Sequence, residues 1–386
     1  MRTGTANLPL HGGRCPAWLF TEMRELGTAI VQAIVYEYGP TEVLTRLSDP
    51  FWFQALGCVL GFDWHSSGVT TTVCGALKEG LKPFQGELGL FLAGGKGKTS
   101  RKTPQEIDEA GDKYGLSNDL EELKHASRMA AKVDNNALQD GFQIYHHFFV
   151  FTRQGEWTVI QQGLNDETGY ARRYHWLSKG ITSFVCEPHS AVSCDIAMPS
   201  LNLVAEEGGL SRQVISALSC ENPDKTFKLL TKISPTPSGQ LTLPFTENIP
   251  EKPGKLPARN LNMPAHHYVP RSAQLKRALE SAYLRQPDTF ETLVSLQGVG
   301  AGALRALALV AEVIHGVKPS YRDPVRYSFA HGGKDGHPFP VDREAYRNSV
   351  ECLQNAVGKA KLGETAKIKA LRKLAGLERN IDLSNK

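Results

Sequence analysis

Apolar side chains recur every three or four residues along much of the chain, and this spacing places them on one face of an α-helix. In the first such segment, residues 16–39, the repeat consists of Leu19, Met23, Leu26, Ile30 and Ile34. The same spacing predicts helices at 41–47, 50–60, 69–81, 117–133, 211–218 and 224–232, and one that begins at Thr103.

Residues 142–152 alternate instead and are rich in β-branched and aromatic side chains, which is typical of a strand. A turn at 153–156 leads to a second strand at 157–161, so we expect the two to form a hairpin. A further strand is predicted at 181–188. The mixture predicts an α+β fold with a small antiparallel sheet.

Residues 234–264 contain seven prolines and no apolar repeat, which is typical of a linker or an extended strap. Downstream, every periodic segment is helical: 272–284, 290–296, 302–315, 323–330, 342–357 and 365–374. We therefore expect a mixed α+β domain over 1–233 that carries any catalytic centre, a linker over 234–264, and an all-α domain over 265–386.

The chain has 386 residues, of which 41% are hydrophobic, and this is enough to bury a core. It holds no apolar run of the ~18 residues that a membrane helix needs, and its N-terminus lacks the pattern of a secretory signal. Seven irregularly spaced cysteines favour reduced thiols. The sequence thus predicts a cytoplasmic protein without a membrane partner, and it leaves the oligomeric state open.

Positive charge is concentrated toward the C-terminus. Residues 265–386 contain 19 Lys and Arg against 12 Asp and Glu, whereas residues 1–264 contain 25 against 28. A basic region of this kind favours a polyanionic partner, with DNA expected first and RNA as the alternative.

The segment LQGVGAGALR at 296–305 joins two predicted helices through a Gly-Val-Gly turn. The turn glycines allow close approach to a phosphate, and the start of the second helix directs N–H groups toward it. The segment resembles the helix-hairpin-helix motif of DNA-repair enzymes, which grips one backbone without reading sequence. An ordinary helical hairpin with glycines for close packing is the alternative. The predicted DNA contacts are Gly298, Val299, Gly300, Gly302 and Arg305, extended by Arg322, Arg326, Lys334 and Arg343.

A glycine- and cation-rich loop at 94–102 adds Lys96, Lys98 and Arg101 as predicted phosphate contacts. The loop lacks the spacing of a nucleotide-binding P-loop, so no nucleotide cofactor is expected. A plain surface loop is an equal alternative.

Helix-hairpin-helix glycosylases carry a catalytic lysine where this chain has Gly302, so the resemblance implies no Schiff-base lyase step. Their catalytic aspartate lies further along the chain, and either Asp323 or Asp342 would fill that role here. Each of these aspartates also suits an ordinary helix N-cap.

Polar residues that suit phosphodiester chemistry gather between residues 134 and 176. The candidate catalytic residues are Asp140, His146, His147, Gln161, Gln162, Arg172, Arg173 and His175. Neighbouring residues on a strand face opposite sides, so His146 and His147 are expected to point apart.

Two mechanisms suit this set. Hydrolysis with Mg²⁺ or Mn²⁺ needs two carboxylates, and the partner of Asp140 would have to be Asp134, Glu156 or Glu167. Without a metal, two imidazoles could act as acid and base. The alternative is that these residues have no catalytic role, with the histidines buried in the sheet and the arginines exposed at its surface. The sequence does not identify the ligands of a metal ion.

Several motifs are also family signatures: LPLHGG (8–13), LSDPFWFQALGCVLGFDWHSSG (47–68), GGKGKTSRKTPQEI (94–107), IQQGLN (160–165), ARRYHWLS (171–178) and FAHGGKDGHPFPVDREAY (329–346). Together they resemble a bacterial and archaeal family known as domain of unknown function 763. The resemblance covers most of the chain and implies no particular activity.

The sequence favours a DNA-binding protein that processes nucleic acid, in the first place a phosphodiester-cleaving nuclease of DNA repair. The alternatives are a monofunctional glycosylase and a DNA-binding module without catalysis. Metal-dependent strand scission, an abasic product without metal, or binding without product would distinguish the three.

Overall fold

The computed structural model describes most of the chain. The described residues are 15–61, 68–116, 119–194, 199–232, 234–235, 240–242, 261–262, 273–325, 343–360, 363, 367–368 and 370–371.

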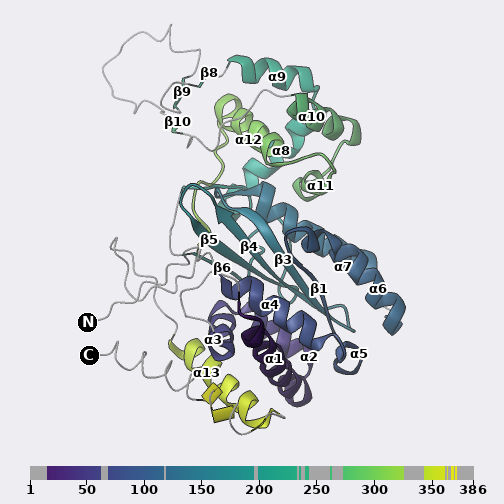
Figure 1. Ribbon diagram of the computed structural model, residues 1–386. Helices are drawn as coiled ribbons and strands as arrows, with labels where there is room; N and C mark the ends of the chain where they lie inside the picture. Colours follow the sequence, from purple (N-terminus) through teal and green to yellow (C-terminus); the bar gives the residue numbers. More distant parts are fainter. Residues whose placement is uncertain are drawn as a thin grey trace, which may run out of the picture.

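A five-stranded antiparallel sheet forms the centre of the molecule (Figure 1). Its strands, in spatial order, are β1 (Leu90–Lys96), β3 (Gln143–Thr152), β4 (Trp157–Asn165), β5 (Tyr170–Leu177) and β6 (Ala191–Ser193). The predicted α+β class and the small antiparallel sheet are confirmed. Strand β3 alternates Phe148 and Val150 on one face with Phe149 and Phe151 on the other, so both faces of the sheet are buried.

The strand predicted at 181–188 is wrong, and the sheet uses β5 and β6 instead. The 181–188 segment is a loop whose apolar side chains pack against the core, with Val185 buried and Ile181 and Phe184 partly buried. Phe184 stacks on Trp157 with 6.0 Å between ring centroids. The apolar residues of this segment are therefore explained by aromatic packing, and not by the backbone hydrogen bonds of a strand.

One face of the sheet is covered by the N-terminal helices (Figure 1). They are α1 (Ala17–Tyr38), α2 (Pro40–Ser48), α3 (Pro50–Leu60) and α4 (Gly68–Leu81), followed by the short α5 (Gln85–Leu88). Asp49 caps α3 by accepting the N–H groups of Phe51 and Trp52, and Pro50 begins the helix. Near the C-terminus, α13 (Arg343–Lys359) packs on α1 and α3.

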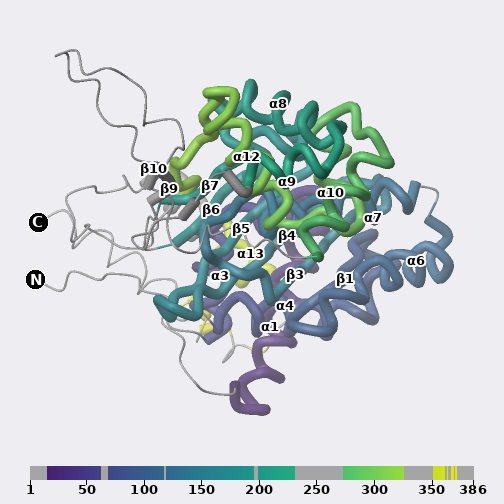
Figure 2. The backbone as a smooth tube through the Cα atoms, turned by 90° about the horizontal axis from the view of Figure 1, so that it is seen from above, coloured from purple at the N-terminus to yellow at the C-terminus, as the bar shows by residue number. Residues whose placement is uncertain are grey.

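The other face carries α6 (Thr103–Tyr114) and α7 (Leu120–Lys132), and a second group of helices lies at one end of the sheet (Figure 1). This group consists of α8 (Gly209–Ser219), α9 (Pro223–Lys232), α10 (Ala273–Arg285), α11 (Phe290–Ser295) and α12 (Ala301–His315). Figure 2 shows α8, α9, α10 and α12 together from above.

Short elements complete the described part. They are the 3₁₀ helices η1 (Gly97–Lys102) and η3 (Glu206–Gly208), the π-helical turn η2 (Val133–Ala137), the strand pair β2 (Leu138–Gln139) and β7 (Leu201–Asn202), and the strands β8 (Ser234–Pro235), β9 (Gln240–Thr242) and β10 (Leu261–Asn262).

The helices of the last third share their cores with the first part of the chain. Leu279 of α10 and Leu307 of α12 belong to the same core as Phe149 of the sheet. Leu353 of α13 belongs to the core on the opposite face. Residues 323–325, predicted to begin a helix, are not helical. The independent all-α domain and the boundaries at 234–264 stay predictions.

Within the described ranges, no helix combines the length and the apolar character that crossing a membrane requires. All seven cysteines are free thiols.

Candidate functional site

The predicted hairpin is formed by α11, the turn at 296–300 and α12. Gly298 has a φ of +89°, the left-handed region that favours glycine. Val299 is 3% exposed and belongs to the core, as expected for a residue that fills the space between two helices. Helix α12 begins after Gly300 without a side-chain cap.

Side chains of the first part of the chain hold this hairpin in place. The amino group of Lys132, at the end of α7, donates to the carbonyls of Val294, Ser295 and Leu296 at 3.0, 2.9 and 2.6 Å. Burial lowers the pKa of Lys132. Lys132 thus occupies the C-terminal carbonyls of α11, where a cation is favourable.

Gln139 connects β2 to α12. Its amide donates to the carbonyl of Ala301 at 2.9 Å, and its oxygen accepts from Nε of Arg305 at 2.6 Å. Burial lowers the pKa of Arg305 to about 10, so the guanidinium is still charged at neutral pH. These contacts fix where the N-terminus of α12 points.

The first turn of α12 is open at Gly302. A Cβ added at Gly302 would meet no atom within 4 Å, and Gly298 is exposed. A helix N-terminus leaves N–H groups without intrahelical partners and carries a partial positive charge. A phosphate oxygen could therefore approach the backbone here.

The second cationic loop lies at the same end of the sheet. Lys96 at the end of β1 pairs with His146 of β3, and Gln143 at the start of β3 lines one pocket with Ala301 and Arg305. This pocket, about 340 Å³ in volume, separates the hairpin from the sheet. The end of β1 and the start of α12 therefore lie toward the same end of the sheet.

All four cations of this loop, Lys96, Lys98, Arg101 and Lys102, are exposed. Among the described residues, none of them forms an ion pair with a carboxylate. Lys96 lies over the ring of Tyr145 at 5.8 Å. These cations are available to an anionic partner, and we call the hairpin turn and η1 together the basic end of the sheet.

Of the other predicted DNA contacts, the two that the structure describes do not join the basic end. Arg322 is exposed and pairs with Glu187 and Glu207 at 3.4 and 3.3 Å. Arg343 is the first residue of α13, which packs on the opposite side of the sheet from the hairpin. Arg326 and Lys334 lie outside the described residues.

The candidate catalytic residues divide between the two faces of the sheet. His147, Gln161 and Arg172 project toward α7, on the face of Phe149. His146, Gln162, Arg173 and His175 project toward α3 and α4, on the face of Phe148. The structure therefore does not gather the eight residues in one site, because strand alternation separates neighbours.

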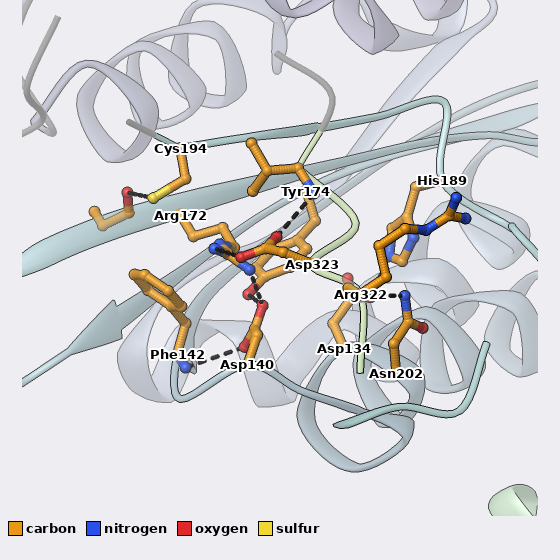
Figure 3. Close-up of polar contacts among 12 residues, drawn as sticks. Asp134, Asp140, Phe142, Arg172, Tyr174, His189, Cys194, Asn202, Arg322 and Asp323 are labelled. Carbon is orange, nitrogen blue, oxygen red and sulfur yellow. Dashed lines mark hydrogen bonds and ion pairs between the residues drawn. The ribbon is translucent and has the colours of Figure 1, made fainter. Parts of the chain in front are cut away.

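Asp140 belongs to a buried ion-pair cluster (Figure 3). The Arg172 guanidinium donates to Asp140 and to Asp323, each at 2.8 Å, and the Tyr174 hydroxyl donates to Asp140 at 2.6 Å. The N–H of Phe142 bonds the other Asp140 oxygen at 3.1 Å. Burial raises the pKa of Asp140, although Arg172 opposes this shift. Asp140 is 1% exposed, so its oxygens serve the fold and face no solvent.

Asp134 organises a second buried network on the same face. Its oxygens accept hydrogen bonds from the Gln161 amide, the Trp176 indole at 2.9 Å, and His189. Gln161 also contacts the ring of His147, whose other nitrogen lies 2.8 Å from the Ser127 hydroxyl. Sequence reasoning did not connect His189 with Asp134, since a lone histidine in a loop carries no signal of its partner.

Polar residues on the α3–α4 face surround Arg173. Its guanidinium donates to Thr70 and Gln54, both at 2.9 Å, and stacks on Phe53. Burial lowers the pKa of both His146 and His175 to about 3, so both imidazoles are neutral at pH 7. Thr70 and Gln54 were not predicted, because their helices are apolar in sequence and only the fold brings them to the strand.

Among the described residues, no cluster of three or more His, Cys, Asp or Glu side chains is arranged to hold a metal ion. Of the two glycosylase candidates, Asp323 is engaged by Arg172 and by the N–H of Val325. Asp342 lies outside the described residues.

Comparison with curated proteins and with solved structures found no significant match for this chain. A family model described as protein of unknown function (DUF763) matches residues 4–341. This match spans most of the chain and agrees with the motifs in the sequence, and the chain therefore belongs to that family.

Proposed function

We propose that the protein binds nucleic acid, with the phosphate backbone contacting the basic end of the sheet. The observation that carries this proposal is the open, uncapped N-terminus of α12 between the exposed Gly298 and the space at Gly302. The exposed cations of η1 at the same end supply the second half of the surface.

Each part of this surface suits phosphate and none of it reads a base. Backbone N–H groups at a helix start hold one phosphate, and flexible lysines neutralise its neighbours without defining a sequence. We therefore propose sequence-independent binding, with DNA as the first partner because the turn resembles the hairpin of DNA-repair enzymes.

Strand cleavage, which the sequence favoured, stays a prediction. A metal-dependent nuclease needs carboxylate oxygens that are open to the ion. The oxygens of Asp140 are already bonded to Arg172, Tyr174 and the N–H of Phe142. Labelled DNA and RNA incubated with the protein in Mg²⁺, Mn²⁺ or EDTA would test for cleavage separately from binding.

Substitution at Gly302 tests the binding proposal without disturbing the fold. Gly302→Glu and Gly302→Gln add side chains of nearly equal size into open space. Glutamate suits the first turn of a helix and replaces a poor helix former, so both variants should fold as well as the wild type. Only Glu places negative charge against a phosphate.

Fluorescence anisotropy with a labelled duplex and a labelled single strand provides the measurement. We expect Gly302→Glu to weaken binding about tenfold, the loss of one charge-assisted contact, while Gly302→Gln changes it much less. Equal affinities of the two variants would show that no phosphate lies at the start of α12.

A further inference from the structure

The pocket between the hairpin and the sheet has the size and the mixed lining of a small-molecule site. Its volume of about 340 Å³ lies at the lower end of the range for such sites, ~300–1,000 Å³. The apolar side chains of Leu138, Phe142 and Leu164 line part of it. Ala301, the first residue of α12, lines it as well. The pocket therefore adjoins the start of α12, where we place a phosphate.

One buried donor of this pocket has no hydrogen-bond partner. Asn165, the last residue of β4, is 5% exposed and lines the pocket. Its side-chain oxygen accepts the N–H groups of Glu167 and Thr168, both at 3.0 Å, which fixes the orientation of the amide. Within the described part of the chain, nothing accepts a hydrogen bond from its amide nitrogen Nδ2. Buried polar groups are almost always bonded in folded proteins, so this donor indicates a ligand with an acceptor.

Two carboxylates lie next to this donor in the same turn. Asp166 and Glu167 follow Asn165 directly, line the pocket and are exposed. Among the described residues, neither of them forms an ion pair. Ionised carboxylates only accept hydrogen bonds, and they repel a phosphate. The turn thus offers one donor beside two acceptors, which suits a neutral ligand that carries a carbonyl next to an N–H group.

We propose that this pocket binds one unpaired nucleobase that has a carbonyl beside a ring N–H. Guanine, thymine and uracil have such an edge, whereas adenine and cytosine do not. Asn165 donates to the carbonyl, Glu167 or Asp166 accepts the ring N–H, and the apolar side chains contact the flat faces of the base. The inference rests on the proposed nucleic-acid binding, and it adds one position of base preference to contacts that otherwise recognise only phosphate.

The base that enters the pocket belongs to a single strand. The edge that carries the carbonyl and the N–H is the Watson–Crick edge, which is bonded to the other strand in a duplex. Proteins read this edge mainly in single-stranded nucleic acid, where the bases can turn outward. Because Ala301 lines the pocket, a strand whose phosphate lies at the start of α12 brings its bases to the pocket.

Labelled oligo(dU) and oligo(dC) of equal length test the proposal by fluorescence anisotropy with the full-length protein. The two strands have the same backbone and rings of similar size, so phosphate contacts and stacking are closely matched. They differ in the edge of the base, because cytosine has no ring N–H beside its carbonyl. We expect the wild type to bind oligo(dU) about tenfold more tightly, the contribution of roughly one hydrogen bond to a charged group.

Two variants alter the hydrogen-bonding groups of the pocket. Asn165→Asp keeps the oxygen that accepts two N–H groups of the turn and removes the donor. Glu167→Gln keeps the size of an exposed side chain and removes its negative charge. Each change in charge shifts the affinity for both strands, so the readout is the ratio of the two affinities. We expect this ratio to fall toward unity in both variants.

Thr168→Asp is the control for the added charge of Asn165→Asp. Thr168 is an exposed residue of the same turn and does not line the pocket. Its hydroxyl accepts the N–H of Tyr170 at 3.4 Å, and an aspartate oxygen can accept the same bond. This variant should bind both strands more weakly and keep the wild-type ratio.

Three results would overturn the base pocket. If the wild type binds the two strands equally, the pocket takes no base of this kind, although backbone binding stands. If it binds neither strand, the proposed nucleic-acid binding fails together with the inference. If Asn165→Asp and Glu167→Gln both keep the wild-type ratio, the preference for oligo(dU) arises at another part of the protein.

Discussion

Two arginines of this protein illustrate how burial determines the contribution of an ion pair to the stability of the fold. Arg172 is fully buried between Asp140 and Asp323 and joins strand β5 to the segment after α12. Arg322, one residue before Asp323, is exposed and contacts Glu187 and Glu207. Each arginine forms two ion pairs, but only the ion pairs of Arg172 lie in the low-dielectric interior of the protein.

Arg172→Met should therefore lower the free energy of unfolding by about 3–5 kcal/mol, because it leaves the buried carboxylate of Asp140 and the largely buried carboxylate of Asp323 without this partner. Arg322→Ala should lower it by less than about 1 kcal/mol, since water replaces its contacts. Urea unfolding followed by circular dichroism measures both values. A similar decrease in the free energy of unfolding of the two variants would contradict a stabilising role for the buried ion pairs of Arg172.

At the scale of elements, the hairpin depends on one residue of another helix. The amino group of Lys132 is bonded to three carbonyls at the end of α11, so the hairpin should loosen without it. Lys132→Met keeps the length of the side chain and removes the donor. We expect faster amide hydrogen exchange in α11 and the turn, and weaker nucleic-acid binding.

Lys124→Met on the same helix is the control. Lys124 pairs with Asp108 and Glu121, away from the hairpin. Exchange in the hairpin should stay at the wild-type rate in this variant. If Lys132→Met leaves exchange and binding unchanged too, the turn is held by its own helices and not by α7.

Helices and strands with a regular pattern of apolar residues were predictable from the sequence, and those with an interrupted pattern were not. The hairpin of β3 and β4 and the helices α11 and α12 follow from local spacing. Strand β5 was missed because Arg172, Arg173 and His175 interrupt its apolar pattern, and their partners are distant in sequence. Likewise, sequence placed the candidate catalytic residues near one another, while the fold separated them across a sheet.

At the scale of the whole molecule, the sheet has two unlike ends. The basic end holds the hairpin turn and η1. The opposite end holds the β3–β4 turn, where Arg153 is bonded to the carbonyls of Tyr114 and Gly86. Exposed lysines are present at both ends, including Lys82 and Lys113 at the opposite end. Total charge alone therefore does not decide where an anion binds, and matched substitutions can separate the two ends.

The most direct test of the account compares two double variants with the same loss of charge. Lys98→Ala with Lys102→Ala alters the basic end, and Lys82→Ala with Lys113→Ala alters the opposite end. Affinity for a labelled duplex is measured at several salt concentrations. We expect the first variant to bind more weakly and its plot of log affinity against log salt to flatten by about 0.9 per lost phosphate contact, while the second keeps the wild-type slope. Equal slopes and affinities in both variants would contradict backbone binding at the basic end of the sheet.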